Sequence, residues 1–92
     1  MTISDAEVNR LAWTMLGEAR PTDTNGMLAV GNVIMNRYAA GGRYGSTITN
    51  ITRPDQFATW SSGAQGNNPQ ARFPVSSPYF QKAKALATQL IN

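Results

Sequence analysis

The sequence contains no cysteine and no histidine. Without cysteine, the chain has no disulfide framework and no thiolate nucleophile. Cysteine and histidine supply the usual ligands of structural zinc, so we expect no metal site and no cofactor. The Ser-His and Cys-His systems of nucleophilic catalysis are excluded for the same reason. If the chain is an enzyme, carboxylates are its expected acid–base groups.

Acidic residues are also scarce. The whole set is Asp5, Glu7, Glu18, Asp23 and Asp55. Eight lysines and arginines give a net charge of +3, but they are scattered, whereas nucleic-acid binding favours a cluster or a stripe. We therefore expect no nucleic-acid partner, and a mildly basic surface also suits an acidic cell-wall polymer.

The chain has no long apolar run. Its 92 residues make one small domain, and no run approaches the roughly 18 residues of a membrane span. The first residues lack the basic stretch and apolar core of a secretory signal. We therefore expect no signal peptide and no membrane span, and a substrate outside the cell would require delivery by another component.

The first predicted helix has clear boundaries. Its apolar face follows the helical repeat and consists of Val8, Leu11, Ala12, Met15 and Leu16. Ser4 and Glu7 have the spacing of a capping box, with Ile3 as the staple residue. Pro21 disfavours helical geometry in the residue before it. The pattern predicts a helix over residues 5–19 and a turn over 21–25.

A second helix is predicted over residues 26–38. Its apolar face is Met27, Val30, Ile34 and Tyr38, with Val33 alongside. Ala29 and Gly31 are small enough to allow another helix to approach closely. A glycine inside a helix lowers helix propensity, so a packing reason is expected at Gly31.

The remaining elements are shorter or less regular. We predict a short helix over residues 47–51 capped by Ser46, and a long loop over residues 61–77, which are rich in Ser, Gly, Asn and Pro. Ser77 and Pro78 have the N-cap and first-turn pattern of a last helix that runs to the end of the chain. The predicted fold class is a mostly α, small helical domain with long loops.

Glu18 continues the apolar face of the first helix. It lies three residues after Met15 and seven after Leu11. A carboxylate on a buried stripe is costly unless it is paired, hydrogen-bonded or protonated, and a carboxyl group kept protonated near neutral pH can act as a general acid. The alternative is that Glu18 lies past the last turn and points to water, or pairs with Arg20 or Arg37. The spacing leaves both interpretations open.

Several segments together resemble a known family. Residues 17–20, Gly-Glu-Ala-Arg, are followed by Gly26 and by Ala-Val-Gly-Asn-Val-Ile-Met-Asn-Arg over residues 29–37. This resembles the SleB-type cell-wall hydrolases, the spore cortex-lytic enzymes, whose pattern is Gly-Glu-Ala/Ser-Arg, a gap with Gly, and Ala-Val-Ala-x-Val-Ile-Leu-Asn-Arg. Residues 52–57 resemble, more loosely, the Gln-Pro-Gly-Gln-Phe-like segment of that family. The resemblance covers about residues 8–92.

The resemblance implies a lysozyme-like, mostly helical fold around a glycan cleft. It implies cleavage of peptidoglycan between N-acetylmuramic acid and N-acetylglucosamine, with Glu18 as the catalytic acid. By chain position, Gln56 and Phe57 would line the cleft. Asn36 and Arg37 match the motif, Asn36 as a polar residue of the scaffold or cleft and Arg37 as a residue that pairs with a carboxylate.

Aromatic side chains are the usual platforms for sugars, because their apolar faces pack on the C–H surfaces of pyranose rings. The aromatic residues in or beside predicted loops are Tyr44, Phe57, Trp60, Phe73 and Tyr79. We expect Tyr44, Phe57 and Trp60 to contribute to substrate binding. Filling of the core is the alternative for each of these side chains.

The chain departs from the family pattern at two places. Pro21 stands where the family often has Gly-Glu. Family domains also continue beyond the late helix with a Gly-Ala-x-x-Tyr/Phe segment, whereas this sequence stops at Asn92. We therefore expect the C-terminal segment of the family to be absent, and a C-terminal fragment or a partner chain to complete the domain.

The scarcity of carboxylates favours one mechanism. Ordinary glycosidases use two carboxyl groups, about 5 Å apart for retention or about 6.5–9.5 Å apart for inversion. Asp23 and Asp55 are the loop candidates for a second group, and each is more readily explained as a turn former. A lytic transglycosylase needs one acid–base residue, so this mechanism with Glu18 is our prediction.

The alternative is a non-catalytic cell-wall-binding or virion structural module that retains the fold. The expected setting is a bacteriophage lytic protein, either an endolysin in the host cytoplasm that is delivered to the wall or a virion-associated protein with phage tail or other virion proteins as partners. If the chain is an enzyme, peptidoglycan is its expected substrate in either of these settings.

Overall fold

The computed structural model describes residues 3–63 and 66–92. Their secondary structure is α1 (Asp5–Glu18), α2 (Thr24–Ala39), α3 (Ile48–Ile51), the 3-10 helix η1 (Ala58–Trp60), α4 (Pro69–Arg72) and α5 (Pro78–Ile91). Within these two ranges the chain forms helices and no strand, which confirms the predicted mostly α class. No helix in the described parts of the chain is long and apolar enough to cross a membrane.

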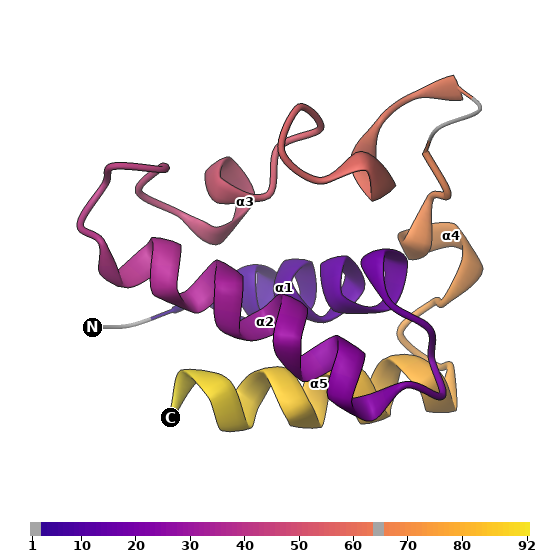
Figure 1. The fold of residues 1–92 in the computed structure, drawn as a ribbon. Coiled ribbons are helices and arrows are strands. Elements are labelled where there is room, and N and C mark those ends of the chain that lie inside the picture. The colour runs from indigo at the N-terminus through magenta and orange to yellow at the C-terminus, as the bar shows by residue number, and fades with distance from the viewer. Residues whose placement is uncertain (1–2, 64–65) are drawn as a thin grey trace.

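α1 is the central helix of the molecule. It packs against α2 and α5 on one side, and α2 and α5 also contact each other. The segment that carries α3, η1 and α4 passes over the other side of α1 (Figure 1). As a result, Leu11, Ala12, Met15 and Leu16 on α1 are at most 1% exposed.

The core joins α1 to α5 through aromatic and small side chains. Phe80 on α5 is 1% exposed, and its ring centroid lies 4.7 Å from that of Trp13. The indole N–H of Trp13 donates to the carbonyl of Phe73 at 2.7 Å, which satisfies its polar atom. Ala83 and Ala87 are fully buried, as the predicted apolar face of the last helix requires.

The ends of α1 differ in part from the prediction. Ser4 is the N-cap, and its hydroxyl accepts from the backbone N–H of Glu7 at 3.3 Å. The carboxylate of Glu7 accepts instead from Thr49, from the backbone N–H at 3.1 Å and from the hydroxyl group. Glu7 therefore connects α1 to α3, and only half of the capping box forms. α1 ends at Glu18 rather than Ala19, because Ala19 has extended backbone geometry.

α2 begins earlier than predicted and ends one residue later. Asp23 is its N-cap, and the Oδ1 atom of Asp23 accepts from the N–H of Gly26 at 2.8 Å, so the helix starts at Thr24. A Cβ atom on Gly31 would clash with Leu90 and lie 3.1 Å from the sulfur of Met15, which confirms the close approach predicted at this glycine. The same prediction for Ala29 is wrong, because Ala29 is exposed.

Two predictions for the connecting segments differ from the structure. α3 forms as predicted, but its N-cap is Thr47 rather than Ser46, with the Thr47 hydroxyl accepting from the N–H of Asn50 at 3.1 Å. The predicted loop over residues 61–77 contains α4, a single turn capped by Asn68. The content of Ser, Gly, Asn and Pro predicted a loop here, but Pro69 stands at the first position of α4, where a proline can begin a helix as well as break one. Residues 64 and 65 of that loop, like residues 1 and 2, lie outside the described residues.

The central position of α1 makes its contact with α5 the expected main source of stability. Phe80→Ala should lower the free energy of unfolding by about 3–5 kcal/mol, because it removes a buried ring and leaves a cavity. The matched control is Val33→Ala, since Val33 is 46% exposed. Urea unfolding followed by circular dichroism should give a much lower midpoint for Phe80→Ala and an almost unchanged midpoint for Val33→Ala. Equal midpoints would contradict this description of the core.

Candidate functional site

Glu18 lies at the exposed C-terminal end of α1. It is the last residue of the helix, and its side chain is exposed. Of the two interpretations that the spacing left open, the structure supports the one in which Glu18 points to water, because the chain leaves helical geometry at Ala19 and the apolar stripe ends with Leu16. The ion pairs among the described residues are Arg53–Asp55 and Lys84–Asp5, so pairing of Glu18 with Arg20 or Arg37 is not observed.

One carboxylate oxygen of Glu18 is held by the backbone of η1. The N–H of Thr59 donates to its Oε2 atom at 2.9 Å. Thr59 is 2% exposed, and its hydroxyl donates to the Oδ1 atom of Asn67 at 2.6 Å. The Nδ2 atom of Asn67 donates in turn to the carbonyl of Gly17 at 2.9 Å. These bonds form a closed ring around the helix end, and within the described residues no donor occupies the other carboxylate oxygen.

Gly17 allows this contact to form. A Cβ atom at this position would overlap the Thr59 side chain and lie 2.7 Å from its Cβ atom. Any larger residue would push η1 away from the end of α1 and remove the donor from Glu18. The Gly-Glu pair that carries the resemblance therefore has a packing explanation, with the glycine admitting the segment that holds the carboxylate.

Sequence reasoning missed Thr59 and Asn67. They are separated from α1 by 41 and 50 residues along the chain. Neither residue belongs to a local pattern, and polar contacts at such separations leave no periodicity to detect. The one available signal was the glycine directly before a carboxylate at a helix end, since a glycine there indicates a close approach by another segment.

Trp60, at the end of η1, packs against α1. Its indole N–H donates to the hydroxyl of Thr14 at 2.9 Å, and the guanidinium of Arg10 lies 3.6 Å from the ring. Arg10 also donates to Thr52 from Nε at 2.8 Å and from Nη2 at 3.0 Å. Burial lowers the pKa of Arg10 from its usual value, and the nearby carboxylate of Glu7 partly offsets this effect. One face of the Trp60 ring is therefore already occupied by a protein cation.

Three of the predicted cleft residues gather around Arg37 on α2. The Nη1 atom of Arg37 donates to the side-chain oxygen of Gln56 at 3.4 Å. Its guanidinium lies 5.2 Å from the ring of Tyr44 and 5.6 Å from that of Phe57. Phe57 is 7% exposed and fills the core, whereas Tyr44 is 40% exposed. The expected pairing of Arg37 with a carboxylate is replaced, within the described residues, by the Gln56 amide and these two rings.

The other predicted residues lie elsewhere. Asn36 is exposed on α2, next to Arg37 in the chain. Phe73 is 7% exposed and belongs to the core, and it meets the half-exposed Tyr79 edge-on at 6.1 Å between centroids. Residues 56–60 connect the residues around Arg37 with Glu18, because Gln56 contacts Arg37 and Thr59 contacts Glu18.

The remaining loop carboxylates have partners of their own. Asp23 caps α2 through Gly26, and Asp55 is exposed and pairs with Arg53 at 2.8 Å. Both side chains therefore bond within the turns in which they lie, as expected if Asp23 and Asp55 are turn formers. Among the described residues, no group of three or more acidic side chains could hold a metal ion.

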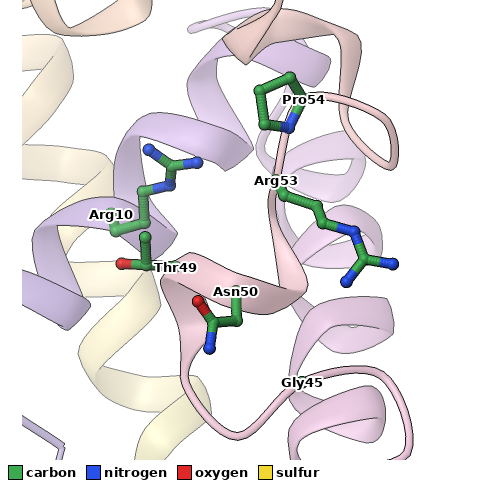
Figure 2. A pocket seen from close by; sticks show the side chains of 6 residues that line it. All are labelled: Arg10, Gly45, Thr49, Asn50, Arg53 and Pro54. Carbon is green, nitrogen blue, oxygen red and sulfur yellow. The ribbon is translucent and has the colours of Figure 1, made fainter.

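Two hollows lie along the segment above α1. One, of about 300 Å³, is lined by Thr59, Trp60, Ser61, Ser62, Gly63, Gly66 and Asn68, and it adjoins Glu18 through Thr59. The other, of about 310 Å³, is lined by Arg10, Gly45, Thr49, Asn50, Arg53 and Pro54 (Figure 2). In the second hollow the side chain of Arg53 points away from that of Arg10. Thr59, which lines the first hollow, is also the residue that bonds Glu18, whereas Glu18 itself lines neither of the two hollows.

The chain belongs to the cell wall hydrolase family, because the sequence model of that family, described as Cell Wall Hydrolase, matches residues 22–92. Neither a curated protein nor a solved structure matches the chain. The matched stretch contains Asn36, Tyr44, Gln56, Phe57 and Trp60, and it begins just after Glu18. Membership in this family supports a role in degrading peptidoglycan.

The packing at Gly17 can be tested directly. Gly17→Ala should destabilise the fold by about 1–3 kcal/mol, because the added methyl group overlaps Thr59. An alanine in a helix would otherwise be favoured over glycine by up to about 1 kcal/mol, so the sign of the effect is informative. Thermal unfolding of the single variants and of the Gly17→Ala/Thr59→Gly double variant measures the coupling. We expect Gly17→Ala to cost much less in the Thr59→Gly background, and an equal cost in both would contradict the predicted overlap.

Proposed function

We propose that this protein cleaves peptidoglycan glycan strands between N-acetylmuramic acid and N-acetylglucosamine as a lytic transglycosylase of the SleB type, with Glu18 as its general acid and base. The observation that carries the proposal is the 2.9 Å hydrogen bond from Thr59 to an otherwise exposed carboxylate. This bond fixes the direction of the carboxyl group while one oxygen remains accessible to a substrate. Membership in the cell wall hydrolase family supports peptidoglycan as that substrate.

The reaction uses one carboxyl group twice. Protonated Glu18 donates its proton to the glycosidic oxygen, the bond from that oxygen to the anomeric carbon of muramic acid breaks, and the N-acetylglucosamine side leaves with a new hydroxyl group. The 6-hydroxyl oxygen of the same muramic acid bonds to the anomeric carbon, and its proton passes to the Glu18 carboxylate. The acid is thereby restored, the product ends in 1,6-anhydromuramic acid, and no water is consumed.

The engagement of the two loop carboxylates favours this reaction over a two-carboxylate scheme. A glycosidase with a second carboxyl group needs it within about 5–9.5 Å of the first. The loop carboxylates Asp23 and Asp55 are occupied by a helix cap and an ion pair. A muramic acid substrate supplies its own nucleophile, so the site needs only to orient one acid and one sugar.

The residues that we assign to substrate binding form two groups beside segment 56–60. Trp60 lines the same hollow as Thr59, the residue that bonds Glu18. Tyr44 and Gln56 are exposed next to Arg37, with the exposed Asn36 directly before Arg37 on α2 and Phe57 supporting the group from the core side. The exposed ring of Tyr44 and the amide of Gln56 suit a sugar, since sugars combine apolar C–H faces with hydroxyl groups.

Glu18→Gln tests the assignment of the acid. Glutamine retains an oxygen that can accept the Thr59 hydrogen bond but cannot donate an acidic proton, so the fold should be kept and the rate should fall by at least about 10²–10⁴-fold. Mass spectrometry of muropeptides released from purified peptidoglycan measures the rate and the product together. We expect anhydromuramic ends from the wild-type protein and none from Glu18→Gln.

Asp55→Asn and Asp23→Asn are the matched controls, since each neutralises one loop carboxylate. Both should release anhydromuramic products at a rate close to that of the wild-type protein. Reducing muramic ends in place of anhydro ends would refute transglycosylation and direct attention to these two aspartates. Binding without any product from the wild-type protein would instead favour the non-catalytic wall-binding module.

A further inference from the structure

We propose that Arg37 and Arg43, together with the ring of Tyr44, bind carboxylate groups carried by the glycan strand, so that the protein prefers strands with free carboxylates. The inference deepens the function proposed above and rests on peptidoglycan being the substrate. We call these three residues the arginine–tyrosine surface. They lie at the C-terminal end of α2 and in the loop that follows it.

Two cations share one exposed aromatic ring on this surface. The guanidinium of Arg37 lies 5.2 Å and that of Arg43 lies 5.6 Å from the ring centroid of Tyr44. Both distances are within the range of a cation–π contact, which orders a guanidinium without neutralising it. The ring is 40% exposed, so this arrangement faces solvent.

Neither cation has an acidic partner among the described residues. The ion pairs there use Arg53 with Asp55 and Lys84 with Asp5. Arg10, by contrast, is partly buried and donates to Thr52. Arg37 and Arg43 are therefore the arginines that are held together near an exposed ring and carry uncompensated positive charge.

The loop that presents Arg43 and Tyr44 is shaped by glycines. Gly41 and Gly42 have φ angles of 73° and 96°, which L side chains rarely adopt. Gly45 follows Tyr44, and a Cβ atom there would lie 3.0 Å from the Cβ atom of Asn50 and 3.1 Å from the N atom of Ile51. The loop therefore turns sharply after α2 and then packs against α3, which fixes the position of the surface before any ligand arrives.

The chemistry of the surface matches a carboxylated glycan. Guanidinium groups bind carboxylates through paired, charge-assisted hydrogen bonds. Gln56 accepts from Nη1 of Arg37 and so helps to orient that guanidinium. A tyrosine ring packs on the apolar face of a sugar. Peptidoglycan offers both partners, since each muramic acid carries a lactyl group whose carboxyl is free or extended by a peptide with further carboxylates.

The surface lies within reach of the proposed catalytic residue along one short segment. Gln56 contacts Arg37 and Thr59 contacts Glu18. Residues three apart in a chain have Cα atoms separated by at most about 11 Å. A few sugar units of one strand span such a distance, so a strand cleaved at Glu18 can place the substituents of a neighbouring muramic acid on this surface.

The test measures binding separately from cleavage. In the Glu18→Gln background, sedimentation with sacculi freed of teichoic acid should show affinity reduced by about tenfold or more for Arg37→Gln/Arg43→Gln at low salt, as expected for lost charged hydrogen bonds. Arg72→Gln is the matched control, because Arg72 also lies over a ring, 4.9 Å from Phe73, but outside this surface. Arg43→Gln alone, at an exposed position, should give a smaller loss with an unchanged unfolding midpoint.

Chemical amidation of the carboxyl groups in the sacculi should remove the difference between the background protein and the double variant. An amidase that removes the peptides converts the lactyl amides into free lactyl carboxylates, so a preserved difference in affinity shows that lactyl carboxylates suffice for binding, and a lost difference assigns the peptide carboxylates. Equal binding by the double variant, or unchanged binding to amidated sacculi, would overturn the inference. Carboxylate-dependent binding without cleavage by the wild-type protein would instead refute the proposed activity alone.

Discussion

The approach of η1 to the C-terminal end of α1 is the contact on which the candidate site depends. Gly17 leaves room for Thr59, and the backbone N–H of Thr59 then reaches the Glu18 carboxylate at 2.9 Å. Asn67 closes the arrangement by bonding both Thr59 and the carbonyl of Gly17. A buried polar group that loses its partner costs about 1–3 kcal/mol, so these bonds hold together as a set.

The position of α1 explains why such a small domain can support this site. Domains of this size bury a limited fraction of their surface and have a narrow margin of stability. Here one helix contributes to both halves of the core, with α2 and α5 on one side and the segment containing α3, η1 and α4 on the other. The helix that carries the proposed acid is thus also the helix that organises the fold. The acid itself lies at the end of this helix, where a side chain can meet a substrate without opening the core.

Regular elements could be predicted from the sequence because their signals are local. The apolar repeat and the caps at Ser4 and Ser77 located α1 and α5 closely, and the glycine at position 31 correctly indicated a close helix contact. The spacing could not decide whether Glu18 is buried or exposed, because periodicity describes the face of a helix but not the residue at which the helix ends. A shift of a single residue at that boundary decides between the two.

The composition of the site was less predictable than the fold. Thr59 and Asn67 contact the end of α1 across long stretches of chain, and nothing near them in the sequence indicates this. Arg37 was recognised within a motif, but its partners proved to be an amide and two rings rather than a carboxylate. Predicting them would have required knowing how the loop after α2 folds back. The family match, which covers residues 22–92, supports the cell wall hydrolase family that the resemblance indicated, and it begins after Glu18.

The most direct test of a single-carboxylate transglycosylase is to digest peptidoglycan in water enriched in ¹⁸O and to measure the masses of the released muropeptides by mass spectrometry. If Glu18 alone transfers the muramic 6-hydroxyl to the anomeric carbon, the product ends are anhydromuramic and carry no heavy oxygen. Reducing ends labelled with one ¹⁸O atom would show that water is the nucleophile and would contradict the account of a single-carboxylate transglycosylase.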